Sequence, residues 1–350
     1  MSIVEVARIA QVSTATVSRV LNNLPGVRAE TVARVKAAVS ETKYKPQRVH
    51  SRRQKAPRTA KLKSRNIAVI TVGQGSEWLA MPIMASVLAG IQRGVNSNEL
   101  RLLLGEMPDP EKPSPLLSGK QIDGAVVFAS SELSQEQLVA CFRSMQRQTA
   151  IVWCMGTEMA VGVDHVTPDN VSVGRIAFDY LKRQNCRSFG FLTTKPEWPL
   201  MRLRGQAFLN SALDANFKPS AYLCTNQPRV VDAYGPRTKA ADNAEALVAA
   251  FAADPNRPEG LFAGNDLLTT EIYPLLARYG LRVGHDVKIV SCDNEEIRLS
   301  GLHPRPASID IGAEEIGFRA VGRLLNRIDR PNGPPLVIQV MPRLQLPPNT

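Results

Sequence analysis

The chain has 350 residues, which is enough for two or three domains, and 44% of them are apolar. That fraction allows a large core and excludes a chain that is disordered throughout. No apolar run reaches the ~18–20 residues of a membrane span, the first residues lack the regions of a signal peptide, and five scattered cysteines give no disulfide framework. We therefore expect a cytoplasmic protein with no membrane partner.

The net charge of +11 is concentrated at the start of the chain. Residues 1–65 carry 15 Lys and Arg against 3 Asp and Glu, whereas the remaining 285 residues carry 28 against 29. A small basic module joined to a nearly neutral body indicates a head that binds a polyanion. From charge alone, a basic tail that only aids solubility is the alternative.

The first 46 residues read as three short helices. Apolar residues recur at helical spacing over residues 6–10, and Ser13 is a good N-cap for a helix from Thr14 to Asn22. A turn at residues 23–26 precedes a third helix with valines on one face. Two short helices joined by a tight turn and supported by a third are the layout of a helix-turn-helix.

The second predicted helix has two different faces. Thr14, Ala15 and Arg19 lie on one side, and Val17 and Val20 lie on the other. The first side suits a DNA major groove, where Arg pairs with guanine and a Thr or Ala methyl group contacts thymine. An ordinary amphipathic helix with an exposed polar face is the alternative.

Residues 47–65 form a basic linker, and the pattern changes in residues 66–350. Short β-rich runs are expected at 66–72, 100–106, 122–129, 149–155, 188–194, 221–226, 259–265, 286–292 and 335–340. Helices are expected around 82–97, 134–146, 170–184, 200–215, 240–252, 266–279 and 313–328. This alternation predicts parallel sheets covered by helices on both faces, in two lobes rather than one large sheet.

The head resembles the LacI/GalR family of bacterial repressors. The resemblance rests on VSTATVSRVLN at residues 12–22 and on Tyr44-Lys45-Pro46 at the end of the head. It implies an all-α helix-turn-helix head, a hinge that becomes helical on DNA, and an α/β two-lobed sensor of the periplasmic-binding-protein-like type I class. It also implies a homodimer on a pseudo-palindromic double-stranded operator.

Family positions imply which residues contact DNA. Thr14, Ala15 and Arg19 would contact base edges. The phosphate contacts would come from Ser13, Thr16, Ser18, Asn22 and Thr31. Arg48, Arg52 and Arg53 of the basic linker are further expected DNA-binding residues. Arg53 stands where the family hinge has its leucine wedge, which favours a less kinked operator with A/T at its centre; Leu62 is the alternative wedge.

Weaker resemblance continues through residues 166–181, 201–205, 262–268 and 289–296. It implies an effector site formed by Arg202, Asn265 and Asp293, with Asp169 and Asp266 behind them. Several of these residues follow predicted strands, where open α/β sheets bind ligands, and an arginine with carboxylates and an amide suits a sugar-like ligand. The alternative is that Asp266 and Asp293 only cap helices. Residues 309–325 resemble sensors of the xylose-regulator type, which implies a pentose.

Two other functions remain as alternatives. An enzyme on a doubly wound sheet is disfavoured because Trp78 stands where a dinucleotide motif begun by Gly73 and Gly75 needs its third glycine. Nucleotide-binding, hydrolase and zinc motifs are absent, so no cofactor and no metal are expected. A nucleoid protein that binds DNA by charge alone would not respond to small molecules. We expect instead a repressor whose operator affinity depends on a sugar-like effector.

Overall fold

The computed structural model describes residues 3–21, 27–42, 62–75, 81–156, 162–224 and 238–348. The chain divides into two units, Met1–Arg58 and Thr59–Thr350, which are considered separately. Among the described residues, no helix is long and apolar enough to span a membrane.

Unit 1 contains the three expected helices: α1 (Ile3–Ile9), α2 (Thr14–Leu21) and α3 (Ala29–Thr42). Ser13 is the N-cap of α2, since its Oγ accepts a hydrogen bond from the backbone N–H of Thr16 at 3.1 Å. Val6, Val17 and Val35, one from each helix, are fully buried and form the centre of a small core. The predicted apolar face of the second helix is therefore confirmed.

The turn between α1 and α2 begins in the left-handed region of backbone conformation. Gln11 has a φ of +51°, a value that glycine adopts at least cost. The backbone N–H of Val12 closes the turn by donating to Ala7 O at 3.0 Å. The glutamine therefore accepts a small conformational cost at this turn.

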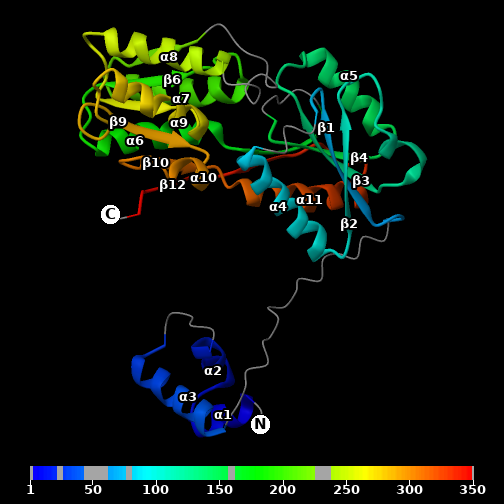
Figure 1. Cartoon of the computed structure of the whole chain (residues 1–350). Helices are drawn as coiled ribbons and strands as arrows, with labels where there is room; N and C mark the ends of the chain where they lie inside the picture. The colour runs from blue at the N-terminus through cyan, green and yellow to red at the C-terminus, as the bar shows by residue number, and fades with distance from the viewer. Residues whose placement is uncertain are drawn as a thin grey trace. The chain divides into compact units, whose positions relative to one another are not determined.

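Unit 2 consists of two lobes, each built on a six-stranded sheet (Figure 1). Lobe 1 has the strand order β11-β5-β4-β3-β1-β2, with all strands parallel. Lobe 2 has the order β12-β10-β9-β8-β6-β7, in which only β12 runs antiparallel to its neighbour. The lobe 1 strands are β1 (Asn66–Val72), β2 (Arg101–Met107), β3 (Gly124–Ala129), β4 (Ala150–Cys154), β5 (Asp164–Pro168) and β11 (Val337–Val340). The lobe 2 strands are β6 (Phe189–Thr193), β7 (Ser220–Leu223), β8 (Gly260–Ala263), β9 (Lys288–Cys292), β10 (Ala307–Asp310) and β12 (Arg343–Gln345).

Helices cover the sheets, and the closest helix pairs meet at glycines. Lobe 1 carries α4 (Pro82–Ser97), the 3-10 helix η2 (Pro115–Lys120), α5 (Gln135–Gln146) and α11 (Ala313–Asp329). Lobe 2 carries α6 (Asn170–Arg183), α7 (Pro199–Asp214), α8 (Thr238–Ala253), α9 (Asp266–Arg278) and α10 (Glu296–Leu299). Helices α4 and α11 pack together so closely that a Cβ on Gly90 would lie 1.9 Å from the carbonyl oxygen of Glu314. Larger residues there would force the two helices apart.

Three segments connect the lobes: the passages from β5 to α6, from β10 to α11 and from β11 to β12. Two of them are joined directly, because the backbone N–H of Asp169 donates to Val340 O at 3.0 Å. In the third, Gly312 has a φ of +70° and donates its N–H to Asp310 Oδ1 at 2.7 Å. The chain thus passes between the lobes through short segments at their facing ends, which is the arrangement of a hinge.

All nine β-rich runs expected from the sequence contain strands, but β5, β10 and β12 were not predicted. Strand β5 reads Asp-His-Val-Thr-Pro and lacks an apolar run, yet all five of its residues are buried. Buried polar side chains require partners from elsewhere in the fold. The partners of Asp164 come from the last sixth of the chain.

Asp164 attaches α11 and β11 to the centre of lobe 1. Its side chain is fully buried and forms ion pairs with Arg323, at 2.7 Å, and with Arg327, at 2.5 Å. The backbone N–H of Leu336, next to β11, also donates to it at 2.8 Å. Burial alone would raise the pKa of Asp164, but the hydrogen bonds from Arg327 and Arg323 outweigh it and lower that pKa.

We predict that Asp164→Ala lowers the free energy of unfolding of unit 2 by about 3–5 kcal/mol, because it leaves two guanidinium groups without their buried partner. Urea denaturation of the full chain measures the change. Asp109→Ala removes a half-exposed carboxylate that pairs with Lys112 at 3.1 Å and is the matched control. That control should cost about 1 kcal/mol or less, and an equal loss in the two variants would contradict the role given to Asp164.

Candidate functional site

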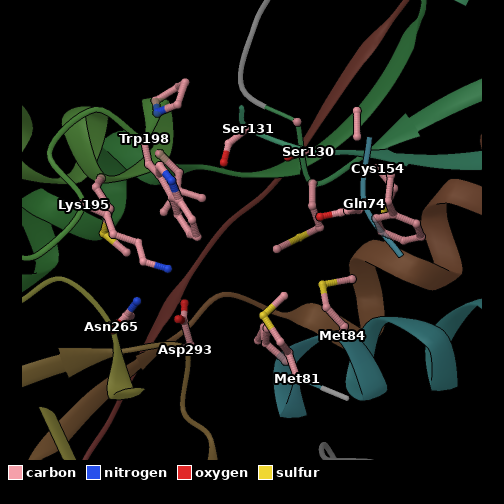
Figure 2. Close-up of a pocket in the computed structure, with 18 of the residues that line it drawn as sticks. Gln74, Met81, Met84, Ser130, Ser131, Cys154, Lys195, Trp198, Asn265 and Asp293 are labelled. Atoms are coloured by element: carbon pink, nitrogen blue, oxygen red, sulfur yellow. The ribbon is translucent and has the colours of Figure 1, made fainter. Parts of the chain in front are cut away.

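A cavity lies between the two lobes of unit 2, at the carboxyl ends of both sheets (Figure 2). Its polar residues follow strand ends directly: Gln74 after β1, Ser130 after β3, Lys195 after β6, Asn265 after β8 and Asp293 after β9. Large apolar side chains supply much of the remaining wall, among them Met81, Met84, Phe128, Trp153, Trp198 and Met201. Apolar walls with a few converging polar groups are typical of small-molecule sites.

The structure brings Asn265 and Asp293 together in the cavity wall, as the family resemblance implied. Arg202 does not join them, because its side chain is exposed and lies outside the cavity lining. The arginine of α7 that lines the cavity is Arg204, two residues further along the helix. Both arginines lie in the first turns of the same helix, so a sequence pattern alone could not decide which one faces the ligand space.

Arg204 is held by three hydrogen bonds. Its side chain is 2% exposed and donates to Asn170 Oδ1 at 3.0 Å, to the carbonyl oxygen of Gly264 at 2.8 Å and to Asp293 Oδ1 at 3.0 Å. Burial would lower the pKa of Arg204, but the charge of Asp293, its hydrogen bond and the other nearby acidic groups together outweigh burial and raise that pKa. Arg204 therefore stays protonated, and its three hydrogen bonds make it a rigid part of the wall.

Asp293 occupies an unusual backbone position, with a φ of +103°. This conformation is rare for a residue other than glycine, and such outliers concentrate at functional sites. The backbone N–H of Asp293 donates to Ile309 O at 2.9 Å, and its carboxylate accepts from Arg204. These two contacts hold the side chain at the cavity.

Asp266 lies behind the wall and not in it. It is fully buried and accepts hydrogen bonds from the hydroxyl groups of Ser291 and Ser308 and from the backbone N–H of Glu295, the last at 2.6 Å. Burial, with the nearby charge of Asp293, raises the pKa of Asp266 to about 7. Its place makes it a support for the loop after β9.

The sequence left open that Asp266 and Asp293 only cap helices, but other residues occupy the cap positions. Asn265 is the N-cap of α9, since its Oδ1 accepts from the backbone N–H of Leu268 at 2.9 Å, and Asp169 is the N-cap of α6. Neither Asp266 nor Asp293 caps a helix. Asp169 lies outside the cavity lining, whereas the amide nitrogen of Asn265 points into the cavity (Figure 2).

Lys195 and Gln74 also line the cavity and were not predicted from the sequence. Lys195 is 8% exposed, and its Nζ lies 3.8 Å from the centre of the Trp198 ring. Burial lowers the pKa of Lys195 to about 8 although Glu271 and Glu132 oppose that shift. Gln74, also 8% exposed, has a buried Nε2 that finds no hydrogen-bond partner in the described part of the chain. Their positions directly after β1 and β6 were the signal that could have found them.

The head presents some of its expected DNA contacts. Thr14 and Arg19 are exposed on α2, and Thr16 is half-buried with its Oγ1 2.9 Å from Ser13 Oγ. Thr31 is half-buried on α3. Outside the described part of the chain lie the side chains of Ala15 and Ser18 and the residues Asn22, Arg48, Arg52 and Arg53.

In the described ranges, no group of three or more His, Cys, Asp or Glu side chains could hold a metal ion. The polar residues of the cavity are instead hydrogen-bonding and charged groups placed around an apolar space. This arrangement can bind a small polar molecule between the lobes.

Two family models match the chain. The model described as bacterial regulatory proteins, lacI family, matches residues 2–47, and a periplasmic binding protein-like domain matches residues 178–346. The chain is 24% identical over 333 residues to the ribose operon repressor of Haemophilus influenzae, covering 94% of this chain and 92% of that protein. It is 25% identical over 348 residues to the transcriptional repressor PurR of Yersinia enterocolitica, covering 98% and 95%.

Solved structures share the fold over nearly the whole chain. A complex of the transcriptional regulator CelR with cellobiose has a TM-score of 0.65 at 20% identity, covering 99% of this chain and 98% of that one. The lac repressor dimer bound to operator and the anti-inducer ONPF has a TM-score of 0.61 at 18% identity, covering 98% and 97%.

We predict that Asp266→Asn flattens the pH dependence of stability. The raised pKa means that the folded protein binds the Asp266 proton more tightly than the unfolded chain does. The contribution of this proton to the free energy of unfolding is fully present below about pH 4 and is lost as the pH rises through about 7. Between about pH 5 and pH 8, the free energy of unfolding of the unmodified protein should fall by about 1–3 kcal/mol more than that of the variant. Urea denaturation at several pH values measures this difference, and parallel pH profiles would contradict it.

Proposed function

Since the chain belongs to the bacterial regulatory proteins of the lacI family, we propose that its cavity binds the effector that controls its operator affinity. It is a DNA-binding repressor, as its relatives are by name. One observation carries the proposal: the head that presents Arg19 and the cavity wall that contains Asn265 and Asp293 belong to one chain. An enzyme on this fold finds no support in these relatives, and the cytoplasm is the expected place of action.

Recognition of DNA rests on α2. Its buried valines fix the helix on the head core, which leaves Thr14 and Arg19 exposed. In this geometry α2 enters the major groove, where the Arg19 guanidinium can pair with a guanine. The basic excess of residues 1–65 adds phosphate contacts that do not depend on sequence and that weaken with salt.

The repressor acts as a homodimer on a pseudo-palindromic operator. The lac repressor structure with a similar fold is a dimer bound to its operator. Two-fold symmetry of the protein matches two half-sites that are related by the same symmetry. The second head also doubles the number of base contacts without requiring a new kind of contact.

The effector can act on the linker through lobe 1. The end of the linker is fixed there by Asp123, whose carboxylate accepts the backbone N–H groups of Lys63 at 2.7 Å, Ser64 at 3.1 Å and Arg65 at 2.6 Å. Leu62 packs against the core of unit 2, which argues against its use as a wedge in DNA. A ligand that changes the angle between the lobes would move this attachment point.

We predict that Arg19→Ala removes most of the sequence preference for the operator. Its Kd for operator should rise by about 5–150-fold, equivalent to ~1–3 kcal/mol, because the base contact is lost. Fluorescence anisotropy with a duplex selected from a random library, and with a scrambled duplex, measures both affinities. Arg34→Ala removes the same charge from an exposed position on α3 and is the control. Equal losses of operator affinity in the two variants would contradict the assignment.

We predict that Arg204→Leu abolishes the response of operator binding to effector, because it releases Asp293 and opens the wall. Arg202→Ala, two residues away and exposed, should keep the response. The effector for this test is any sugar or sugar derivative that raises the melting temperature of the unmodified protein. Operator binding without effector verifies that each variant is folded. Loss of the response in Arg202→Ala alone would return the role to Arg202.

A further inference from the structure

The charged groups of the cavity leave one cation without a partner. Arg204 pairs with Asp293 at 3.0 Å, and Arg298 donates to the carboxylate of Glu295. Lys195 has neither kind of contact: within the described residues, no ion pair or side-chain hydrogen bond reaches its Nζ. Its Nζ lies instead over the face of the Trp198 ring. The carboxylates of Glu271 and Glu132 are near enough to affect its pKa.

This unpaired cation is buried, with 8% of Lys195 exposed, and its ammonium group points across the cavity (Figure 2). Taking an ammonium group out of water is costly unless a counter-charge compensates it. Burial accordingly lowers the pKa of Lys195 to about 8, so the group is still mostly protonated at neutral pH. The ring of Trp198 offsets part of the cost and holds the ammonium group in place.

A second unpartnered group lies in the opposite lobe. Gln74 is only 8% exposed and lines the same cavity, and its buried Nε2 has no hydrogen-bond partner among the residues that the structure describes. An unsatisfied buried donor is costly, and native structures rarely leave one without a reason. The Lys195 ammonium group and the Gln74 amide nitrogen are therefore available donors on opposite sides of the ligand space.

We propose that the effector is an anionic, polar metabolite whose carboxylate or phosphate pairs with Lys195 while an acceptor oxygen at its other end binds the Gln74 amide. The inference rests on the proposed role of the cavity as the effector site, and it identifies the chemical class of the ligand. A neutral sugar would leave the buried ammonium group of Lys195 without an ion pair, with only the carboxylates of Glu271 and Glu132, outside ion-pair distance, to offset its charge. A ligand that uses both groups would also connect the two lobes.

The test compares neutral and anionic members of matched sets by isothermal titration calorimetry on the full chain. One set is D-glucose, D-gluconate, glucose 6-phosphate and 6-phosphogluconate, and the other is D-ribose, D-ribonate and ribose 5-phosphate. Anionic members should bind at least about tenfold more tightly than the neutral sugar of the same set. Gluconate and glucose 6-phosphate separate the two sources of negative charge.

Variants of Lys195 and Gln74 identify the groups responsible. Lys195→Met should weaken binding of the anionic probe by about 10–100-fold, Lys195→Arg should restore part of it, and Lys218→Met, which removes an exposed lysine of the same lobe, should not change it. Gln74→Leu should weaken binding of the same probe without lowering the melting temperature of the free protein, because the amide it removes has an unpartnered nitrogen.

Three results would overturn the inference: equal binding of neutral and anionic members, unchanged binding in Lys195→Met, or no binding by any member of the two sets. None of these three results would contradict the proposed function, which is tested separately by operator affinity. A neutral sugar that binds and shifts operator affinity would keep the repressor and discard the anionic effector. Absence of sequence-specific operator binding, with anionic probes bound through Lys195, would do the reverse.

Discussion

The buried ion pair between Arg204 and Asp293 is the interaction on which the cavity depends. Both groups lose hydration, and the loss is compensated because Arg204 also donates to Asn170 and Gly264, so that its three nitrogens all have partners. The pair joins α7 to the loop after β9 and thereby fixes one wall of the ligand space. Because Asp293 is already neutralised by Arg204, it cannot also serve as the counter-charge of Lys195 without weakening that pair.

Control of DNA binding requires that a change in the cavity reach the linker. The two lobes are connected by three short segments, two of which are hydrogen-bonded to each other, so the lobes can change their angle without unfolding. The Asp123 carboxylate fixes the end of the linker on lobe 1. Any ligand with different affinities for two lobe angles therefore shifts the population of linker positions by that difference in free energy.

Local sequence patterns predicted much of the fold and only part of the site. The faces of α2 and the nine strand-containing runs follow from apolar spacing, which is a property of neighbouring residues. Strand β5 could not be predicted because Asp164 is stabilised by Arg323 and Arg327, more than 150 positions away. Arg204 and Lys195 were missed for a related reason: which side chains face a cavity depends on how α7 and the β6 loop sit against the opposite lobe.

The head is expected to bind a specific DNA sequence, and the cavity is expected to control that binding through its ligand. A single titration tests both. Anisotropy of a selected operator and of a scrambled duplex is measured at physiological ionic strength, with and without a ligand that binds the cavity. We expect the operator to bind at least about 10³-fold more tightly than the scrambled duplex, and the ligand to change only the operator affinity strongly. Equal affinity for the two duplexes would contradict the account.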